Sequence, residues 1–180
     1  VPLIRHESYS PDYRLQASPP LSCERTQLGV SADVVLSSPG DRLTLSADVR
    51  RERFHSTFEG EPSPQNRATP AARYDFLDGS HAGLALRLPG NASLSANYSD
   101  TGRVPGFFEL FGDRGGALSN PLLKPERSFR WDAGGKWRFG GGEFHGSIGC
   151  SRFGNACRDL IQWYTNDAGF VTPENVGGAY

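Results

Sequence analysis

Hydrophobic and polar residues alternate along much of the chain, in segments of about ten residues that are separated by turn residues. In one such segment, every second residue from Leu28 to Leu36 is apolar, and the residues between them are mostly polar or small. Successive side chains of a β-strand point to opposite faces of the sheet, so this segment predicts a strand with one apolar and one polar face. A second segment at 42–54 follows a short turn that contains Pro39 and Gly40. The two segments therefore predict a β-hairpin.

The same two-residue alternation recurs further along the chain. Alternating segments are found at 82–88, 94–98, 129–139 and 144–150, and a last partial strand is expected near Asn175. In the segment at 129–139, most of the positions on one face are aromatic and most of those on the other are charged or polar. Together with the first hairpin, these segments predict an all-β chain of about seven antiparallel strands.

Short turns and long loops alternate between the predicted strands. The short turns lie at 37–41, 89–91 and 140–142, and the long loops, rich in proline and charge, lie at 56–73 and 100–127. Barrels of the bacterial outer membrane have short periplasmic turns, long outer loops and strands with two unlike faces. The sequence therefore favours an antiparallel transmembrane β-barrel segment. A soluble β-sandwich or propeller, whose strands also alternate, is the alternative.

Aromatic residues gather near one of the predicted short turns. Trp137 and Phe139 precede the glycine-rich turn at 140–142, and Phe144 follows it. Aromatic side chains form girdles where a transmembrane barrel meets the two membrane interfaces. We therefore expect these three rings to lie near one rim of the barrel.

Composition and charge exclude several other classes of protein. The 180 residues carry a formal net charge of −1, which provides no basic surface for nucleic acid. No apolar run approaches the roughly 20 residues that a membrane-spanning helix needs, so membrane residence would depend on strands. The N-terminus has no signal-peptide pattern and the chain stops within an expected strand, so we interpret it as an internal piece of a longer protein.

The sequence offers no catalytic or metal-binding constellation. It has no G-x-S-x-G, H-E-x-x-H or phosphate-loop motif, and its four histidines are scattered. Cys23, Cys150 and Cys157 form no C-x-x-C pair and are interpreted as free thiols. Cys150 and Cys157 could form a disulfide only if the chain folded back sharply between them. We therefore expect neither an enzyme nor a bound metal or other cofactor.

A long motif occupies residues 103–134 and reads RVPGFFELFGDRGGALSNPLLKPERSFRWDAG. It resembles the signature of TonB-dependent receptor barrels, which is R-x-P-x-F-x-E-L-F/Y, then N-P-x-L-x-P-E-x-S, then a strand with an acidic residue before glycine. Residues 158–163 (RDLIQW) and 173–177 (PENVG) also look like the next strand and loop of that family. The matching motif residues are Arg103, Pro105, Phe107, Glu109, Leu110, Phe111, Asn120, Pro121, Leu123, Pro125, Glu126, Ser128, Asp132 and Gly134.

The resemblance implies a fold and a function. TonB-dependent receptors are barrels of about 22 strands, plugged by an N-terminal domain and driven by an inner-membrane energy complex. By this resemblance, residues 1–180 are an internal part of the barrel domain, without the plug domain, the energy-coupling segment or the terminal strands. The implied location is the bacterial outer membrane. The implied function is energised import of a scarce chelate, either an iron–siderophore or cobalamin, and residues 158–163 and 173–177 lean slightly toward the cobalamin receptors.

The implied partners follow from that function. They are outer-membrane lipid, a TonB-type energy-coupling protein that binds through the missing N-terminal region, and a chelated metal or cobalamin as ligand. No nucleic acid is expected. Two other functions stay open from the sequence alone. One is a passive outer-membrane pore or a barrel enzyme, and the other is a soluble carbohydrate-binding β-sandwich.

Two roles are open for the motif itself. Pro121 and Pro125 restrict the backbone before the next strand, and Glu126 can accept hydrogen bonds from loop amides or pair with Arg103 or Arg127. These features favour a structural latch at the extracellular rim over direct ligand contact. Affinity for a chelate would come from aromatic and charged loop residues that enclose it. The candidate ligand-binding residues are Phe107, Phe108, Phe111, Arg114, Trp163, Tyr164 and Phe170.

Overall fold

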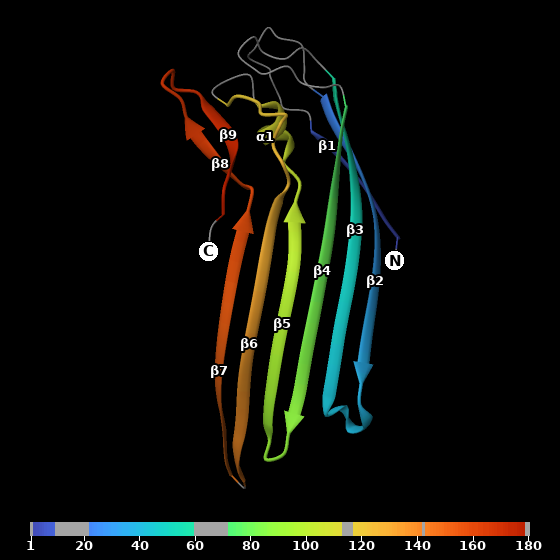
Figure 1. Cartoon of the computed structure of the whole chain (residues 1–180), viewed down its shortest axis with the longest axis vertical. Coiled ribbons are helices and arrows are strands. Elements are labelled where there is room, and N and C mark those ends of the chain that lie inside the picture. Colours follow the sequence, from blue (N-terminus) through green and yellow to red (C-terminus); the bar gives the residue numbers. More distant parts are fainter. Residues whose placement is uncertain (1, 10–21, 60–71, 113–116, 142, 179–180) are drawn as a thin grey trace.

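The computed structural model describes residues 2–9, 22–59, 72–112, 117–141 and 143–178 (Figure 1). Seven strands form one antiparallel sheet in which each strand pairs with its neighbour in sequence, so the predicted all-β fold of about seven antiparallel strands is confirmed. In Figure 1 the strands run side by side along the long axis, and the short turns lie at the lower end.

The seven strands are long. Where alternation predicted a strand, the observed strand is longer than the predicted segment. They are β1 (Pro2–Tyr9), β2 (Ser22–Ser37), β3 (Leu43–Glu59), β4 (Ala72–Leu88), β5 (Ala92–Arg103), β6 (Glu126–Gly141) and β7 (Phe144–Arg158). The predicted loops at 56–73 and 100–127 are correspondingly shorter. Residues at the ends of these predicted loops belong to the strands instead, and Ser56 at one such end is buried under another part of the chain.

Three smaller elements lie at the end of the sheet opposite the short turns (Figure 1). They are α1 (Phe107–Phe111), β8 (Leu160–Thr165) and β9 (Val171–Val176). β8 and β9 pair with each other in a separate two-stranded ribbon, so the strand predicted near Asn175 does not extend the large sheet. No helix in the described ranges is long and apolar enough to cross a membrane.

The register of the paired strands places their apolar residues on one continuous face of the sheet. Residues directly opposite one another in an antiparallel pair share a face, and Leu36, Leu45, Leu84 and Ala96 follow one another in this way from β2 to β5. No second layer covers this face in the part of the chain that the structure describes, and Val30 on it is 61% exposed. A β-sandwich would bury such a face under a second sheet. The exposed apolar face therefore fits a transmembrane barrel segment better than a β-sandwich, and we call it the outward, lipid-facing side.

The opposite face is polar and faces inward. Side chains there pair across strands, as when the Asn97 amide donates to the Asp132 carboxylate at 2.9 Å. Cys157 lies opposite Ser128 on this inward face, whereas Cys150 lies opposite Gly135 on the outward face. All three cysteines are free, as predicted, and the two faces separate Cys150 from Cys157.

Two groups of aromatic residues border the outward apolar band. Trp137, Phe139 and Phe144 are exposed beside the β6–β7 turn, as predicted, and the ring centroids of Trp137 and Phe139 are 5.3 Å apart. A second group, which the sequence analysis missed, lies on the same face toward the other ends of the strands. It consists of Tyr74, Phe76, Tyr98, Phe129 and Trp131.

Candidate functional site

The segment between β5 and β6 packs on the inward face of the sheet, at the end away from the short turns. We call residues 104–112 and 117–125 the inner loop. Leu110 and Phe111 of α1 form a buried cluster with Cys23 of β2, and Phe58 of β3 packs against it. Cys23 and Phe58 are register partners on the inward face. The inner loop is therefore anchored to the inward side of the sheet at this end (Figure 1).

Local chemistry explains the short helix α1. At its start, the Glu109 carboxylate accepts a hydrogen bond from the Gly106 amide at 2.6 Å, which satisfies one of the unpaired amides of a helix N-terminus. At its end, Gly112 adopts a φ of 68°, and a Cβ there would lie 2.4 Å from the carbonyl oxygen of Ala117. Only glycine fits this close approach without displacing the backbone.

Arg103, the last residue of β5, joins two carboxylates of the motif. Its Nε donates to Glu126 at 2.7 Å, and its two terminal nitrogens donate to Glu109 at 2.9 and 3.0 Å. Glu126 also accepts a hydrogen bond from the Ile161 amide at 2.7 Å. Of the predicted partners of Glu126, the pairing with Arg103 is confirmed, whereas the amide that it binds belongs to β8 and not to a neighbouring loop. This network ties β5, α1, β6 and β8 together.

The same contacts change how these groups titrate. The hydrogen bond from Arg103 lowers the pKa of Glu126 below its ordinary value, burial opposes this, and the Ile161 amide lowers the pKa further. Hydrogen bonds to Glu126 and Glu109 raise the pKa of Arg103. Both groups lie beyond the apolar part of their strands, and both stay charged near neutral pH.

Glu126→Gln is expected to remove a pH-dependent part of the stability. Because the pKa of Glu126 is lower in the folded protein, its stabilising effect is fully present above the ordinary carboxyl pKa and is lost as the pH falls through the lowered value. The free energy of unfolding of both proteins should be measured by urea titration across this range. The difference between them should be constant near neutral pH and should shrink in acid. A difference that grows in acid would contradict the assignment.

Arg25 of β2 holds the start of the inner loop. Its side chain is buried, and its Nη2 donates to the carbonyl oxygen of Pro105 at 2.7 Å, while its Nε donates to Ser56 at 3.0 Å. The guanidinium also lies over the ring of Phe107, 4.6 Å from its centroid. A buried arginine of this kind satisfies a loop carbonyl that water cannot reach.

Arg73 of β4 holds the proline-rich end of the inner loop in a similar way. Its Nη1 donates to the carbonyl oxygen of Pro121 at 2.6 Å, and its Nη2 donates to that of Leu123. Two parallel hydrogen bonds of 2.7 Å to the Asp75 carboxylate fix its orientation. Arg73 therefore links the motif to the inward face of β4.

Asn120 and Asn175 connect the inner loop to the β8–β9 ribbon. The Asn120 amide nitrogen donates to the carbonyl oxygen of Pro173 at 2.8 Å. The Asn175 side chain accepts from the Lys124 amide at 2.7 Å and donates to the Lys124 and Asp159 carbonyls at 3.0 and 2.6 Å. The loop and the ribbon thus form one hydrogen-bonded unit.

Most of the predicted motif residues meet in this unit. The residues brought together at the inner loop are Arg103, Pro105, Phe107, Glu109, Leu110, Phe111, Asn120, Pro121, Leu123 and Glu126. Pro125 directly precedes β6. Ser128 and Asp132 lie further along β6, where they contact Asn155 and Asn97. The contacts support the latch role for the motif.

The candidate ligand-binding residues divide into buried and exposed groups. Phe107 and Phe111 lie in the buried cluster, whereas Phe108, Trp163 and Tyr164 are exposed. The rings of Phe108 and Trp163 are 5.2 Å apart, so α1 and β8 present a joint aromatic surface. Phe170 is partly buried just before β9, and Arg114 lies outside the described residues. Within the described ranges, no group of histidine, cysteine or acidic side chains could hold a metal ion.

Sequence reasoning missed Arg25 and Arg73, the two arginines that receive the loop. Both occupy the polar face of a strand, but Arg25 precedes the alternating segment that predicted β2, and Arg73 fell within the predicted loop at 56–73. Each is separated by a long stretch of chain from the carbonyl groups that it binds, 80 residues for Arg25 and 48 for Arg73 with Pro121. No local pattern reports such a contact.

Cys23 is expected to resist thiol reagents while the protein is folded. Its side chain is fully buried, and burial raises its pKa to about 11, an effect that the nearby Arg25 only partly offsets. The thiolate is the reactive form. Alkylation at neutral pH, followed by mass spectrometry, should modify the half-buried Cys157 well before Cys23, and denaturant should abolish the difference. Equal rates in the native protein would contradict the buried position of Cys23.

Comparison with known proteins agrees with this architecture. The family model described as "TonB dependent receptor-like, beta-barrel" matches residues 7–180. A search of curated protein sequences gave no match. One similar solved structure is a copper transporter, OprC, with a TM-score of 0.64 and 18% identity over 87% of this chain. Another is a double mutant of the Serratia marcescens hemophore receptor HasR in complex with its hemophore HasA and heme, with a TM-score of 0.64 and 14% identity over 98% of this chain.

These likenesses define the fold and the family. The chain spans 26% of the OprC chain and 37% of the HasR chain. The two-faced meander sheet and the match over nearly the whole chain point the same way. This chain therefore belongs to the TonB-dependent receptor β-barrel family and is part of a protein of the bacterial outer membrane.

Proposed function

We propose that this chain is an internal part of the barrel wall of a receptor that imports a scarce chelate by TonB-energised transport. The chelate is an iron–siderophore complex or cobalamin. The TonB-type energy-coupling protein acts through a part of the receptor N-terminal to these residues. Two structures with this fold are named a copper transporter and a hemophore receptor in complex with heme, and both names involve metal-containing cargo.

The observation that carries the proposal is the inner loop. A barrel wall that only surrounded a water-filled pore would need no large buried cluster on its inward face. Here Leu110 and Leu123 are fully buried on that face, and Arg25 and Arg73 each bind carbonyl groups of the loop. In a closed barrel this loop would project into the lumen, and it carries Phe108 to the exposed surface beside Trp163. Such an aromatic surface suits a bulky chelate.

Uptake by intact cells tests the function. A strain without the receptor gene, and the same strain with the gene restored, should be compared for uptake of labelled ferric siderophores and labelled cobalamin. Uptake of one ligand should require the gene and should stop when the proton gradient is dissipated. Gene-dependent uptake that continues without the gradient would instead show a passive pore, and the same uptake of every ligand in both strains would refute the proposal.

The aromatic surface yields a more specific prediction. Replacing both Phe108 and Trp163 by alanine is expected to raise the ligand concentration for half-maximal uptake by about tenfold or more, because buried aromatic contacts dominate binding surfaces. Phe144→Ala is the matched control, since this exposed ring lies at the opposite rim. Equal effects of the two changes would place the ligand elsewhere.

A further inference from the structure

Three basic side chains gather on the inward face, at the end of the sheet near the short turns. Arg87 of β4 lies opposite Ser93 of β5, and Ser93 lies opposite Lys136 of β6, so these residues share one row. Arg138 lies two residues further along β6 and therefore on the same face. All three basic residues are exposed. We call Arg87, Lys136 and Arg138 the basic patch.

No carboxylate neutralises the basic patch in the part of the chain that the structure describes. Its three side chains make no ion pair with those residues. The next acidic residue of β6 on this face is Asp132, four residues before Lys136 and so about 13 Å away along the strand. The Asp132 carboxylate accepts a hydrogen bond from Asn97. Neighbouring positive charges raise the local concentration of anions, so this end of the inward face favours a negative group.

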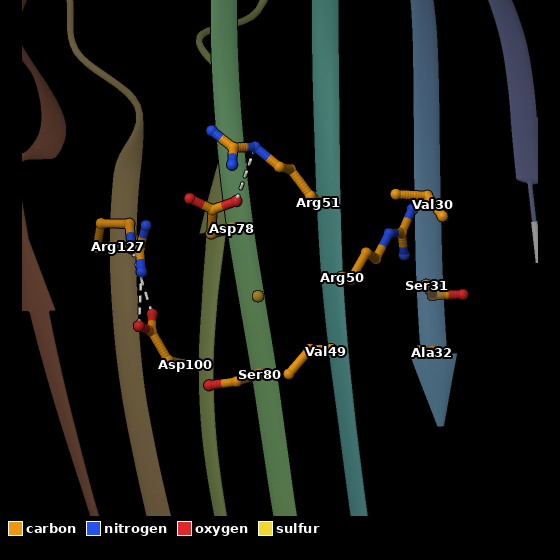
Figure 2. A pocket seen from close by; sticks show the side chains of 11 residues that line it. Val30, Ser31, Ala32, Val49, Arg50, Arg51, Asp78, Ser80, Asp100 and Arg127 are labelled. Atoms are coloured by element: carbon orange, nitrogen blue, oxygen red, sulfur yellow. Dashed lines mark hydrogen bonds and ion pairs between the residues drawn. The ribbon is translucent and has the colours of Figure 1, made fainter. Parts of the chain in front are cut away.

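Arginines of the outward face are placed differently. Figure 2 shows a hollow there, beside which Arg51 lies 3.5 Å from the Asp78 carboxylate and Arg127 lies 2.5 Å from that of Asp100. These two cations already have a carboxylate partner within the chain. The basic patch therefore has charge available for a further anion, whereas this outward pair of arginines does not.

A hollow of about 240 Å³ lies on the inward face beside the basic patch. The inward-facing residues that line it are Ser93, Ser95, Gly134, Lys136, Gly149 and Ser151. Gly149 lies directly opposite Lys136, and a Cβ at Gly149 would lie 3.8 Å from the Cβ of Lys136. The missing side chain thus leaves space open beside the lysine. Around this space the chain offers one ammonium group and three hydroxyl groups, all of which can donate hydrogen bonds.

We propose that this hollow binds an oxyanion, a carboxylate or phosphate group, through Lys136 and the three serine hydroxyls, with Arg87 and Arg138 adding positive charge on either side. The lysine ammonium is a compact charge with three donors, and hydrogen bonds from charged donors to anionic oxygens are the stronger kind. The group comes either from a small free anion in the lumen or from an acidic side chain of another part of the receptor. The site lies at the opposite end of the sheet from the inner loop, so it does not depend on which chelate is imported.

Equilibrium dialysis of the complete receptor, purified in neutral detergent, tests this inference. The probes are labelled citrate, a polycarboxylate, and labelled inorganic phosphate. A hollow variant, Ser95→Leu, keeps every charge and fills the space. The patch variant carries Arg87→Gln, Lys136→Gln and Arg138→Gln. The matched control, which removes the same charge from the outward face, carries Arg51→Gln, Arg53→Gln and Arg152→Gln.

If the anion is free in the lumen, the unaltered receptor binds at least one probe. The patch variant is then expected to bind that probe at least about tenfold more weakly, because each lost charge-assisted hydrogen bond is worth roughly a factor of ten or more. The hollow variant should also bind more weakly, and the outward control should bind like the unaltered receptor. Equal weakening in the patch variant and the outward control would overturn the proposal, as would undiminished binding by the hollow variant.

If the anion is an acidic side chain of the receptor, the unaltered receptor binds neither probe, and stability becomes the measurement. The patch variant and the hollow variant should then both unfold at a lower urea concentration than the unaltered receptor, because each loses the seated carboxylate. Unfolding of both variants at the same urea concentration as the unaltered receptor, in the absence of probe binding, would overturn the proposal. None of these measurements involves uptake, so their outcome is separate from that of the proposed transport function.

Discussion

Ala96→Arg is expected to destabilise the folded receptor by about 2–4 kcal/mol, whereas Ser95→Arg is expected to leave its stability nearly unchanged. The two residues are neighbours in β5 and both are small. Ala96 lies opposite Leu84 and Ala133 on the outward face, within the apolar band. Ser95 lies opposite Ala85 and Gly134 on the inward, polar face. A charged side chain at the first position must enter lipid, and at the second it enters water.

This pair of variants also tests the assignment of the two faces directly. The free energy of unfolding should be measured by denaturant titration in lipid vesicles, with the gel mobility of the folded barrel as a check on assembly. A larger loss for Ser95→Arg would mean that the faces are exchanged. Equal small losses for both variants would mean that Ala96 does not face hydrocarbon.

Leu110→Ala is expected to weaken the inner loop by about 2–5 kcal/mol. Leu110 is fully buried in the cluster between α1, β2 and β8, so its truncation removes apolar contacts and leaves a cavity. The loss should appear mainly as local opening of the loop, because the seven-stranded sheet keeps its own hydrogen bonds. Hydrogen exchange followed by mass spectrometry should show faster exchange of the Gly112, Leu118 and Asn120 amides, which are hydrogen-bonded in the native loop.

Phe108→Ala is the matched control for this prediction. Phe108 lies in the same helical turn, but its side chain is 39% exposed and contacts Trp163 at the surface. Its truncation should change exchange in the loop far less than Leu110→Ala does. Comparable exchange in both variants would mean that the cluster around Leu110 does not hold the loop in place.

The two-faced sheet could be predicted from the sequence because alternation is a local property of a strand. In β2 the positions from Leu28 to Leu36 define the apolar face, and the register of the structure places each of them opposite an outward residue of β3. The aromatic rim at Trp137, Phe139 and Phe144 was predictable for the same reason, since both strands of that hairpin lie next to one short turn.

The inner loop could not be predicted to the same extent, because its place depends on distant residues. Phe107, Phe108 and Phe111 are the same residue type within five positions, yet two are buried and one is exposed. Only the helical turn of α1, which is too short to leave a periodic pattern, decides which ring points to the sheet. The β8–β9 ribbon likewise leaves the large sheet after Arg158, a departure that alternation does not reveal.

The order of the strands has a consequence for the way in which this part of the barrel is assembled. Each of the seven strands pairs with its sequence neighbours, so every hairpin can close without waiting for a distant part of the chain. The inner loop differs, since its start binds Arg25 of β2, 80 residues away, and its end binds Arg73 of β4. Its docking site exists only once β2 to β5 are already paired. The loop is therefore expected to dock only after the β2–β5 part of the sheet has formed.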